Sequence, residues 1–225
     1  MSVYKRQMGE EYNQLHPEIQ KRFDFSTGNS VAFIGRGVME KIWNGNKLAV
    51  AVLKVLSKSN ILFPRVGDNI EYEIHNYPYK DEIGREAHSM NRVFFFPDLE
   101  QRFDGTALFS EKKNQIVEYL GLDHRMLFEM GLSADKNGAI RFSSGKQFVF
   151  LLGLKLPVPS FVRGDIELLE WYDDSKKRFY LDLTVKSKLF GKLFGFWGWF
   201  EGEYLDYKGK DLPGRFKPTR LERKE

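Results

Sequence analysis

Near its end the chain runs Leu189-Phe-Gly-Lys-Leu-Phe-Gly-Phe-Trp-Gly-Trp-Phe200, in which half of the residues are aromatic and Lys192 alone is charged. Successive side chains of a β-strand point to opposite faces, so the phenylalanines from Phe194 onward would share one face, and Trp197 and Trp199 the other. The glycines leave space for rings from neighbouring strands. The stretch predicts the last core strand of a sheet.

The second aromatic face of this strand has three interpretations. In the first it packs against protein in the core. In the second it lines an internal cavity together with Trp43 and the apolar residues 151–156, and binds a lipid-like or aromatic small molecule. In the third it inserts into a membrane interface, where Lys186, Lys188 and Lys192 meet anionic head groups.

The sequence before this strand alternates with a period of two. From Asn69 onward Ile70, Tyr72 and Ile74 share one face, which indicates a half-buried strand. Asp135-Lys-Asn-Gly138 supplies residues that a tight hairpin needs, and residues 151–162, with two prolines, form an apolar crossover that is no central strand. The strands expected are 31–43, 69–75, 85–96, 101–110, 115–120, 125–134, 139–144, 165–172, 178–187 and 194–207.

This pattern predicts a mainly β fold, an antiparallel meander curled into a barrel or half-barrel with a few short helices. Helices are expected over residues 10–16, 17–23 and 47–58. The alternative is an α+β helix-grip fold, in which a bent sheet wraps a long C-terminal helix, but the chain ends in strand and basic tail instead.

The charge distribution separates a neutral body from a basic end. Residues 208–225 hold seven Lys and Arg against three Asp and Glu, and residues 1–207 hold 28 of each sign. A nucleic-acid binder usually carries its basic surplus on the folded body, so we expect no nucleic-acid partner. We expect one β-rich domain over 1–207 and a solvated tail over 208–225.

Neither cysteines nor long apolar segments occur. The absence of Cys excludes disulfides and thiolate chemistry and suits a reducing cytoplasm. No run approaches the roughly 18 apolar residues of a membrane span, and the start lacks the apolar core of a signal peptide. We therefore expect a cytoplasmic protein that is soluble, or peripheral to a membrane at most.

Several stretches taken together resemble a known bacterial family. They are Gly35-Arg-Gly-Val-Met-Glu-Lys-Ile-Trp43, Asn76-Tyr-Pro-Tyr-Lys-Asp-Glu-Ile-Gly-Arg85, Gln101-Arg-Phe-Asp104, Ile116-Val-Glu-Tyr-Leu-Gly121 and Glu170-Trp-Tyr-Asp-Asp174. The family is an uncharacterised domain of unknown function that occurs alone or appended to saccharopine-dehydrogenase-like proteins. The resemblance implies a bacterial source, and no catalytic residues can be carried over from it.

Motifs for cofactors, metals and nucleophiles are weak. Gly35-Arg-Gly37 starts like a dinucleotide fingerprint, but Glu40 stands where the third glycine belongs, so we expect a strand bulge or a close backbone crossing and no cofactor. The four histidines, His16, His75, His88 and His124, include no pair at metal-ligand spacing, so we expect no metal. No Gly-x-Ser-x-Gly motif occurs.

One polar constellation is the candidate for catalysis. His75 and His88 fall on consecutive predicted strands, with Asp104 on the next, and would form an acid–base site if that face turned into a barrel. If the face meets water, it is an ordinary charged sheet surface with cross-strand ion pairs, which is the interpretation we favour.

The sequence therefore predicts a non-catalytic binder or carrier of a hydrophobic, lipid-like ligand. The candidate ligand-binding residues are Trp43, Phe194, Phe196, Trp197 and Trp199. Two alternatives remain open: an enzyme that acts on an apolar substrate through His75, His88 and Asp104, and a peripheral membrane or partner-binding module that uses residues 190–200.

Overall fold

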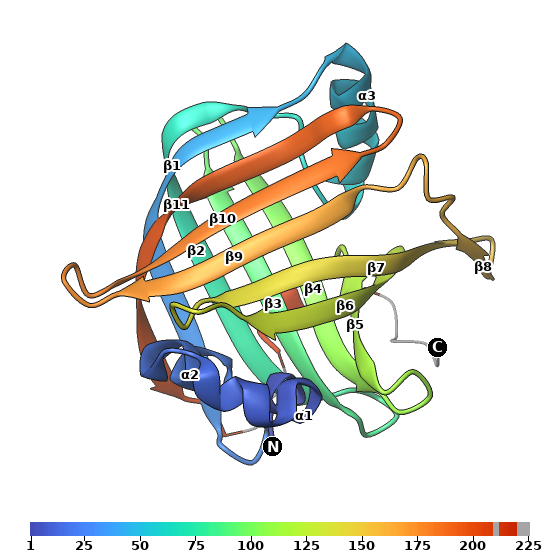
Figure 1. Cartoon of the computed structure of the whole chain (residues 1–225). Coiled ribbons are helices and arrows are strands. Elements are labelled where there is room, and N and C mark those ends of the chain that lie inside the picture. The colour runs from blue at the N-terminus through green and yellow to red at the C-terminus, as the bar shows by residue number, and fades with distance from the viewer. Residues whose placement is uncertain (209–211, 220–225) are drawn as a thin grey trace.

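The chain forms a closed antiparallel β-barrel (Figure 1). In the computed structural model, which describes residues 1–208 and 212–219, eleven strands follow one another, and ten of them form the ring. Each strand up to β7 pairs with its predecessor, β7 also pairs with β9, and β1 pairs with β11. The predicted mainly β fold is confirmed, the sheet is a full barrel, and the helix-grip alternative is wrong.

The strands agree closely with the sequence pattern. Their bounds are β1 Val31–Asn44, β2 Gly67–Lys80, β3 Glu86–Phe95, β4 Glu100–Ser110, β5 Gln115–Leu120, β6 Met126–Ala134, β7 Ile140–Leu151, β8 Leu154–Pro157, β9 Asp165–Asp173, β10 Arg178–Ser187 and β11 Gly191–Asp206. The short β8 lies within the predicted crossover and forms a hairpin with β7 outside the ring. The hairpin turn at Gly138, where φ is +79°, joins β6 to β7 as predicted.

Helices lie at both ends of the barrel (Figure 1). At the lower end α1 (Val3–Met8), the 3₁₀ helix η1 (Gly9–Gln14) and α2 (Pro17–Phe23) lie across the opening, and at the upper end α3 (Lys47–Leu56) runs into η2 (Ser57–Ser59). The short helix expected over 10–16 is present as the 3₁₀ helix η1, which begins at Gly9 and ends at Gln14. The unpredicted α1 precedes it, capped by the Ser2 side chain, which accepts from the Lys5 N–H.

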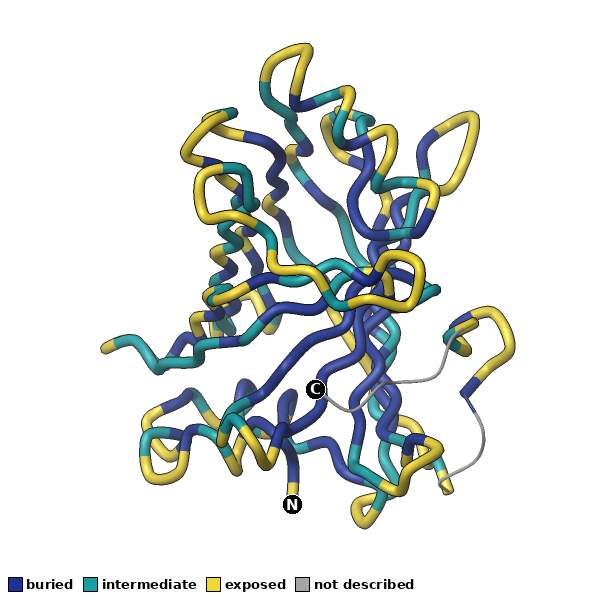
Figure 2. The backbone as a smooth tube through the Cα atoms, turned by 90° about the vertical axis from the view of Figure 1, so that its right-hand side faces the viewer, coloured by how far each residue is buried: buried dark blue, intermediate teal, exposed yellow. Residues whose placement is uncertain are grey.

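The barrel interior is lined mainly by large apolar side chains, and Figure 2 shows long stretches of the strands coloured as buried. Phe194, Phe196 and Phe200 of β11 are fully buried there, whereas Trp197 on the opposite face is 41% exposed. The predicted division of the two aromatic faces is confirmed, and β11 is the last strand of the core.

Part of the C-terminal tail is folded against the barrel. Leu212 and Phe216 are buried on the outer face beside Tyr77 and Val93, and Arg215 pairs with Glu100. Leu212 and Phe216 therefore depart from the expected solvated end, because they cover an apolar patch of the sheet, whereas Pro213, Gly214, Arg215, Lys217 and Thr219 between and after them are exposed. Residues 209–211 and 220–225 lie outside the described residues.

Candidate ligand site

An apolar cavity of about 200 Å³ lies at the upper end of the barrel, and we call it the mouth cavity. It lies between α3, the loop that follows β8, and the turn between β10 and β11. Its wall is apolar apart from Gln147, Arg163 and Gly164. The apolar wall consists of Ala49, Val52, Leu53, Leu56, Ile61, Leu62, Leu120, Met126, Leu127, Phe128, Val149, Val158, Val162, Ile166, Val185, Phe190 and Leu193.

The helix that covers this cavity is specified locally. The Asn46 side chain caps α3 by accepting from the backbone N–H groups of Leu48 and Ala49. Ala49 and Leu53, one turn apart, then face the barrel and are buried. The two polar wall residues are engaged elsewhere, because Gln147 donates to the Gly164 carbonyl and Arg163 pairs with Asp165 at 2.5 Å.

Below the mouth cavity the barrel holds a group of buried charges, which we call the interior cluster: Arg22, Arg92, Glu118 and Glu170. Arg22 reaches in from α2, is fully buried, and its Nε lies 3.3 Å from Oε1 of Glu170 on β9. Its guanidinium also lies 4.3 Å from the centre of the Phe33 ring. A cation that enters a barrel lined with phenylalanine is stabilised by this carboxylate and by the ring faces.

Arg92 and Glu118 line a second cavity of about 30 Å³ between Phe103, Phe128 and the interior face of β9. Nε and Nη1 of Arg92 are buried without a hydrogen-bond partner. Burial raises the pKa of the Glu118 carboxyl to about 7, and the positive charge of Arg92 only partly offsets this. Glu118 can therefore gain or lose a proton near neutral pH.

The two cavities share part of their walls, since Phe128 and Ile166 line both. An apolar space at the mouth thus lies directly above ionisable groups in the interior. Such an arrangement can accommodate a molecule with an apolar body, and it offers polar partners only on the inner side.

The predicted ligand-binding residues divide between the two faces of the sheet. Phe194 and Phe196 lie inside, and their rings contact Phe63 and Phe94. Trp197 and Trp199 lie outside, where the Arg178 guanidinium stacks 3.8 Å from the Trp199 ring. Trp43 also lies outside, and its ring covers Gly195. A Cβ added at Gly195 would lie 2.3 Å from Cζ2 of Trp43.

The catalytic constellation predicted from sequence does not assemble. His88 lies inside, with Nδ1 2.8 Å from the Tyr4 hydroxyl, and burial lowers its pKa well below the ordinary value. His75 lies outside, 4.7 Å from the Phe216 ring and 2.9 Å from Glu73. Asp104 is also on the outer face, 3.0 Å from the Asn60 amide. The two histidines are on opposite sides of the sheet.

The outer face around His75 carries cross-strand ion pairs. Arg36 of β1 bonds to Glu73 of β2 and to Glu203 of β11, each at 3.1 Å. This is the ordinary charged sheet surface that the sequence pattern favoured over an acid–base site. His16 and His124 lie elsewhere, beside Asp174 and Thr106 respectively.

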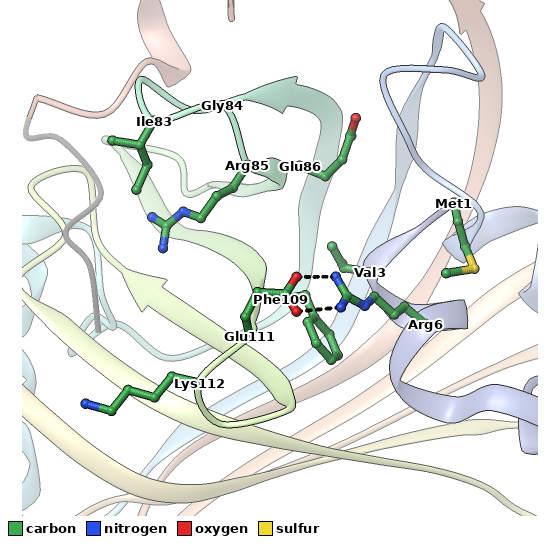
Figure 3. A pocket seen from close by; sticks show the side chains of 10 residues that line it. All are labelled: Met1, Val3, Arg6, Ile83, Gly84, Arg85, Glu86, Phe109, Glu111 and Lys112. Carbon is green, nitrogen blue, oxygen red and sulfur yellow. Dashed lines mark hydrogen bonds and ion pairs between the residues drawn. The ribbon is translucent and has the colours of Figure 1, made fainter.

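A larger surface cleft of about 810 Å³ lies at the opposite end, beside the N-terminus (Figure 3). Arg6 of α1 and Glu111 point toward each other across it and form a two-pronged ion pair at 2.6 and 2.7 Å. The Arg6 guanidinium also lies 3.9 Å from the Phe109 ring. Because these central charges neutralise each other, the cleft is a weaker candidate for ligand binding than the mouth cavity.

The described residues contain no cluster that could hold a metal ion and no helix that could span a membrane. No three His, Asp or Glu side chains in residues 1–208 and 212–219 are placed to hold a metal ion together. Within the same ranges, every helix is too short or too polar to cross a bilayer.

Fold and site together define a closed antiparallel β-barrel with an apolar cavity under its upper helix. The chain belongs to the family described as Domain of unknown function (DUF4166), which matches residues 15–200 and so includes the whole interior cluster. It is also similar to the uncharacterized protein YndH of Bacillus subtilis (strain 168), with 30% identity over 202 residues, covering 90% of this chain and 97% of YndH. No solved structure matches the chain.

These comparisons confirm the expected relationship to an uncharacterised family. The appended saccharopine-dehydrogenase-like context stays a prediction. Sequence reasoning missed the interior cluster, because Arg22, Glu118 and Glu170 carry the same residue types as solvated surface positions. One signal was present: Glu118 stands on the inward side of the apolar run Ile116-Val-Glu-Tyr-Leu120, where a surface residue would not be expected.

Proposed function

We propose that this protein is a non-catalytic carrier of a hydrophobic, lipid-like small molecule that occupies the mouth cavity. The observation that supports the proposal is an almost wholly apolar space of about 200 Å³ with both polar wall side chains engaged elsewhere. For scale, an engineered apolar cavity of about 150 Å³ in another protein binds benzene. A ligand's apolar part would be removed from water at about 25 cal/mol for each Å² buried.

The alternative of an enzyme built on His75, His88 and Asp104 receives no support from the geometry. An acid–base pair must reach the same substrate within hydrogen-bond distance. His75 and Asp104 lie on the outer face and His88 inside. We therefore propose binding rather than catalysis.

Displacement of a fluorescent fatty acid tests the proposal. The emission of cis-parinaric acid rises in an apolar environment, so its titration and displacement by palmitate would measure binding. Intrinsic tryptophan emission is the less suitable reporter, because all four tryptophans, Trp43, Trp171, Trp197 and Trp199, lie on the outer face.

A pair of matched variants on α3 locates the binding site. Val52 lines the mouth cavity, whereas Val55, one turn further along, is 66% exposed. Val52→Phe fills the cavity and should weaken cis-parinaric acid binding by about tenfold or more, while Val55→Phe should leave it unchanged. Equal affinity in both variants, or no binding by the unmodified protein, would contradict the proposal.

A further inference from the structure

We propose that the surface surrounding the mouth cavity docks onto a bilayer rich in anionic phospholipids. We call this surface the basic rim, and it consists of residues 44–60, 145–164 and 185–193. Parts of all three segments line the mouth cavity, and in Figure 1 α3 and the β10–β11 turn lie at the upper end of the barrel, with β8 lower down on the right-hand side. The docking proposal does not depend on whether the cavity holds a ligand.

Charge is the first observation. The basic rim contains nine Lys and Arg and not one Asp or Glu, although one of the nine, Arg163, pairs with Asp165 just outside the rim. Residues 1–207 as a whole are neutral, with 28 charges of each sign, so the rest of this body holds 19 basic against 28 acidic residues. A positive surface confined to one end of a neutral body is complementary to a negatively charged plane.

Exposed apolar side chains are the second observation, and they lie among these positive charges. Leu152 at the tip of the β7–β8 hairpin is 94% exposed, Leu154 63%, Phe161 56% and Leu189 59%. Large apolar groups held in water at loop tips are typical of surfaces that contact a membrane or a partner.

The outward side of α3 repeats this combination. Leu48 and Val55 are seven residues apart, so they share one side of the helix, and they are 56% and 66% exposed. Lys47 and Lys54, also seven residues apart, lie beside this stripe, and Lys58 follows in η2. An apolar stripe flanked by lysines is the pattern of a helix that lies in a membrane interface.

The parts of the rim are joined to one another. The Leu189 N–H donates to the Phe161 carbonyl at 2.9 Å, which links the β10–β11 turn to the loop after β8. The Asn46 side chain at the start of α3 donates to the Phe190 carbonyl at 3.5 Å. The rim is thus one surface, and docking through it would place the opening of the mouth cavity against the lipid.

The apolar tips favour a bilayer over a nucleic acid as the occupant. Nucleic-acid surfaces are recognised mainly through phosphate contacts from Lys and Arg, and exposed leucines contribute little there. An interfacial surface needs both cations for head groups and apolar side chains for the acyl boundary. The rim shares Lys186, Lys188 and Lys192 with the membrane interpretation made from sequence, but not its aromatic side chains, since Phe194 and Phe196 are buried in the core.

Co-sedimentation with vesicles tests the proposal. The full chain is mixed with vesicles of phosphatidylcholine alone or of phosphatidylcholine with phosphatidylglycerol, at low and at high salt. We expect binding to the anionic vesicles only, weakened by salt. Equal binding to both vesicle types, or to neither, would overturn the proposal.

Two pairs of variants separate the apolar and the charged contributions. Leu152→Ser/Phe161→Ser should reduce anionic vesicle binding by about tenfold, and Lys54→Gln/Lys188→Gln by a similar factor. The matched controls lie away from the rim: Ile83→Ser/Leu205→Ser, which are 48% and 37% exposed, and Lys112→Gln/Lys136→Gln. All replaced side chains are exposed, so folding should be preserved.

Three results would separate membrane docking from a polyanion site and from the carrier function. Rim variants that bind vesicles as well as the controls do would overturn the proposal. Binding of duplex DNA that requires the rim lysines but not Leu152 and Phe161 would replace it with a polyanion site. Val52→Phe should keep vesicle binding even where it loses cis-parinaric acid, so a failure of the carrier function can be told apart from a failure of docking.

Discussion

At the scale of single residues, the unusual feature is a carboxyl group buried among phenylalanines. Glu118 is 4% exposed and lines the inner cavity opposite Arg92. Burial raises its pKa to about 7, so near neutral pH the folded protein holds a proton that the unfolded chain releases. The group therefore links the stability of the barrel to pH.

The sign of this linkage gives a prediction for Glu118→Gln. The pKa of Glu118 in the folded protein lies above the unfolded value of about 4.5. The raised pKa therefore contributes its full stability to the fold below pH 4.5, and this contribution is lost as pH rises to about 7. Glutamine stays neutral at every pH, so its contribution to stability does not change with pH. Between pH 4.5 and pH 8 the unfolding free energy of the variant should therefore rise by about 3 kcal/mol relative to that of the unmodified protein.

Urea unfolding of both proteins at pH 4.5 and at pH 8 measures this effect. The difference between the two proteins isolates Glu118 from the other buried groups, including Glu170, whose pKa is also raised by burial. A difference in unfolding free energy that is the same at both pH values would contradict the prediction.

The positions of the polar residues show where sequence reasoning is limited. Alternation shows that His75 and Glu73 share a face opposite to Ile74, and the structure agrees. The side on which His88 falls depends on the length of the preceding turn, which shifts the register of β3 against β2. In the structure Pro78 is opposite His88, and Asn91 is opposite His75. A one-residue difference in register would have exchanged the faces.

At the scale of elements, the backbones of β1 and β11 lie very close together where both strands carry glycines. A Cβ added at Gly37 would lie 2.0 Å from the Trp199 carbonyl oxygen, and one at Gly198 would lie 2.2 Å from that of Val38. The β1–β11 register shifts between Met39 and Lys41, just beyond this contact. Gly37 of the dinucleotide-like motif therefore serves a close backbone contact, as the sequence predicted, whereas Gly35 leaves space for the side chains of Phe33, Ile74 and Phe200.

Gly37→Ala should destabilise the barrel by about 3 kcal/mol, because the obstructing atoms are backbone and the two strands would have to separate. Gly28→Ala is the matched control, since its new Cβ would meet only the Ser26 hydroxyl at an ordinary 3.8 Å. The control should change stability by less than about 1 kcal/mol. Thermal and urea unfolding would show the contrast, and similar stabilities for both variants would refute it.

Most elements could be predicted from the sequence, and the exceptions have local causes. Residues 178–187 form a strand with the predicted bounds because their alternation is unbroken, and residues 115–120 do so because Asn114 and Gly121, both with positive φ, bound the apolar run. β7 continues past the predicted end at Ser144 to Leu151, although Gly145 and Lys146 interrupt the pattern, because β8 pairs with its extension. The short α1 escaped prediction because its six residues show little periodicity, and packing of Val3 and Tyr4 holds it in place.

At the scale of the whole molecule, the end of the chain returns to the middle of the barrel wall. Phe216 is 5% exposed, and it covers His75 on one side and the Arg102 guanidinium, 5.2 Å away, on the other. Burial lowers the pKa of His75, although Glu73 opposes the shift. The titration of His75 thus reports whether this segment is attached.

Phe216→Ala should raise the pKa of His75 toward its ordinary value, because water that reaches the ring stabilises the imidazolium form. Residues 1–207 should stay folded, since the barrel ring closes without the segment. NMR titration of the His75 ring signals measures the shift, and Phe161→Ala, at an exposed position on the rim, is the control. A His75 pKa that stays unchanged in Phe216→Ala would show that the segment does not cover it.

The uneven charge of residues 1–207 also affects how the molecule is oriented as it approaches a charged surface. Nine positive charges at one end, and a net nine negative charges over the remainder of residues 1–207, make the neutral body a strong electric dipole. Within a Debye length of a charged plane, about 8 Å at physiological salt, such a molecule experiences a torque as well as an attraction. It would rotate with its cavity end toward an anionic surface during approach, so orientation would precede contact and would vanish as salt is added.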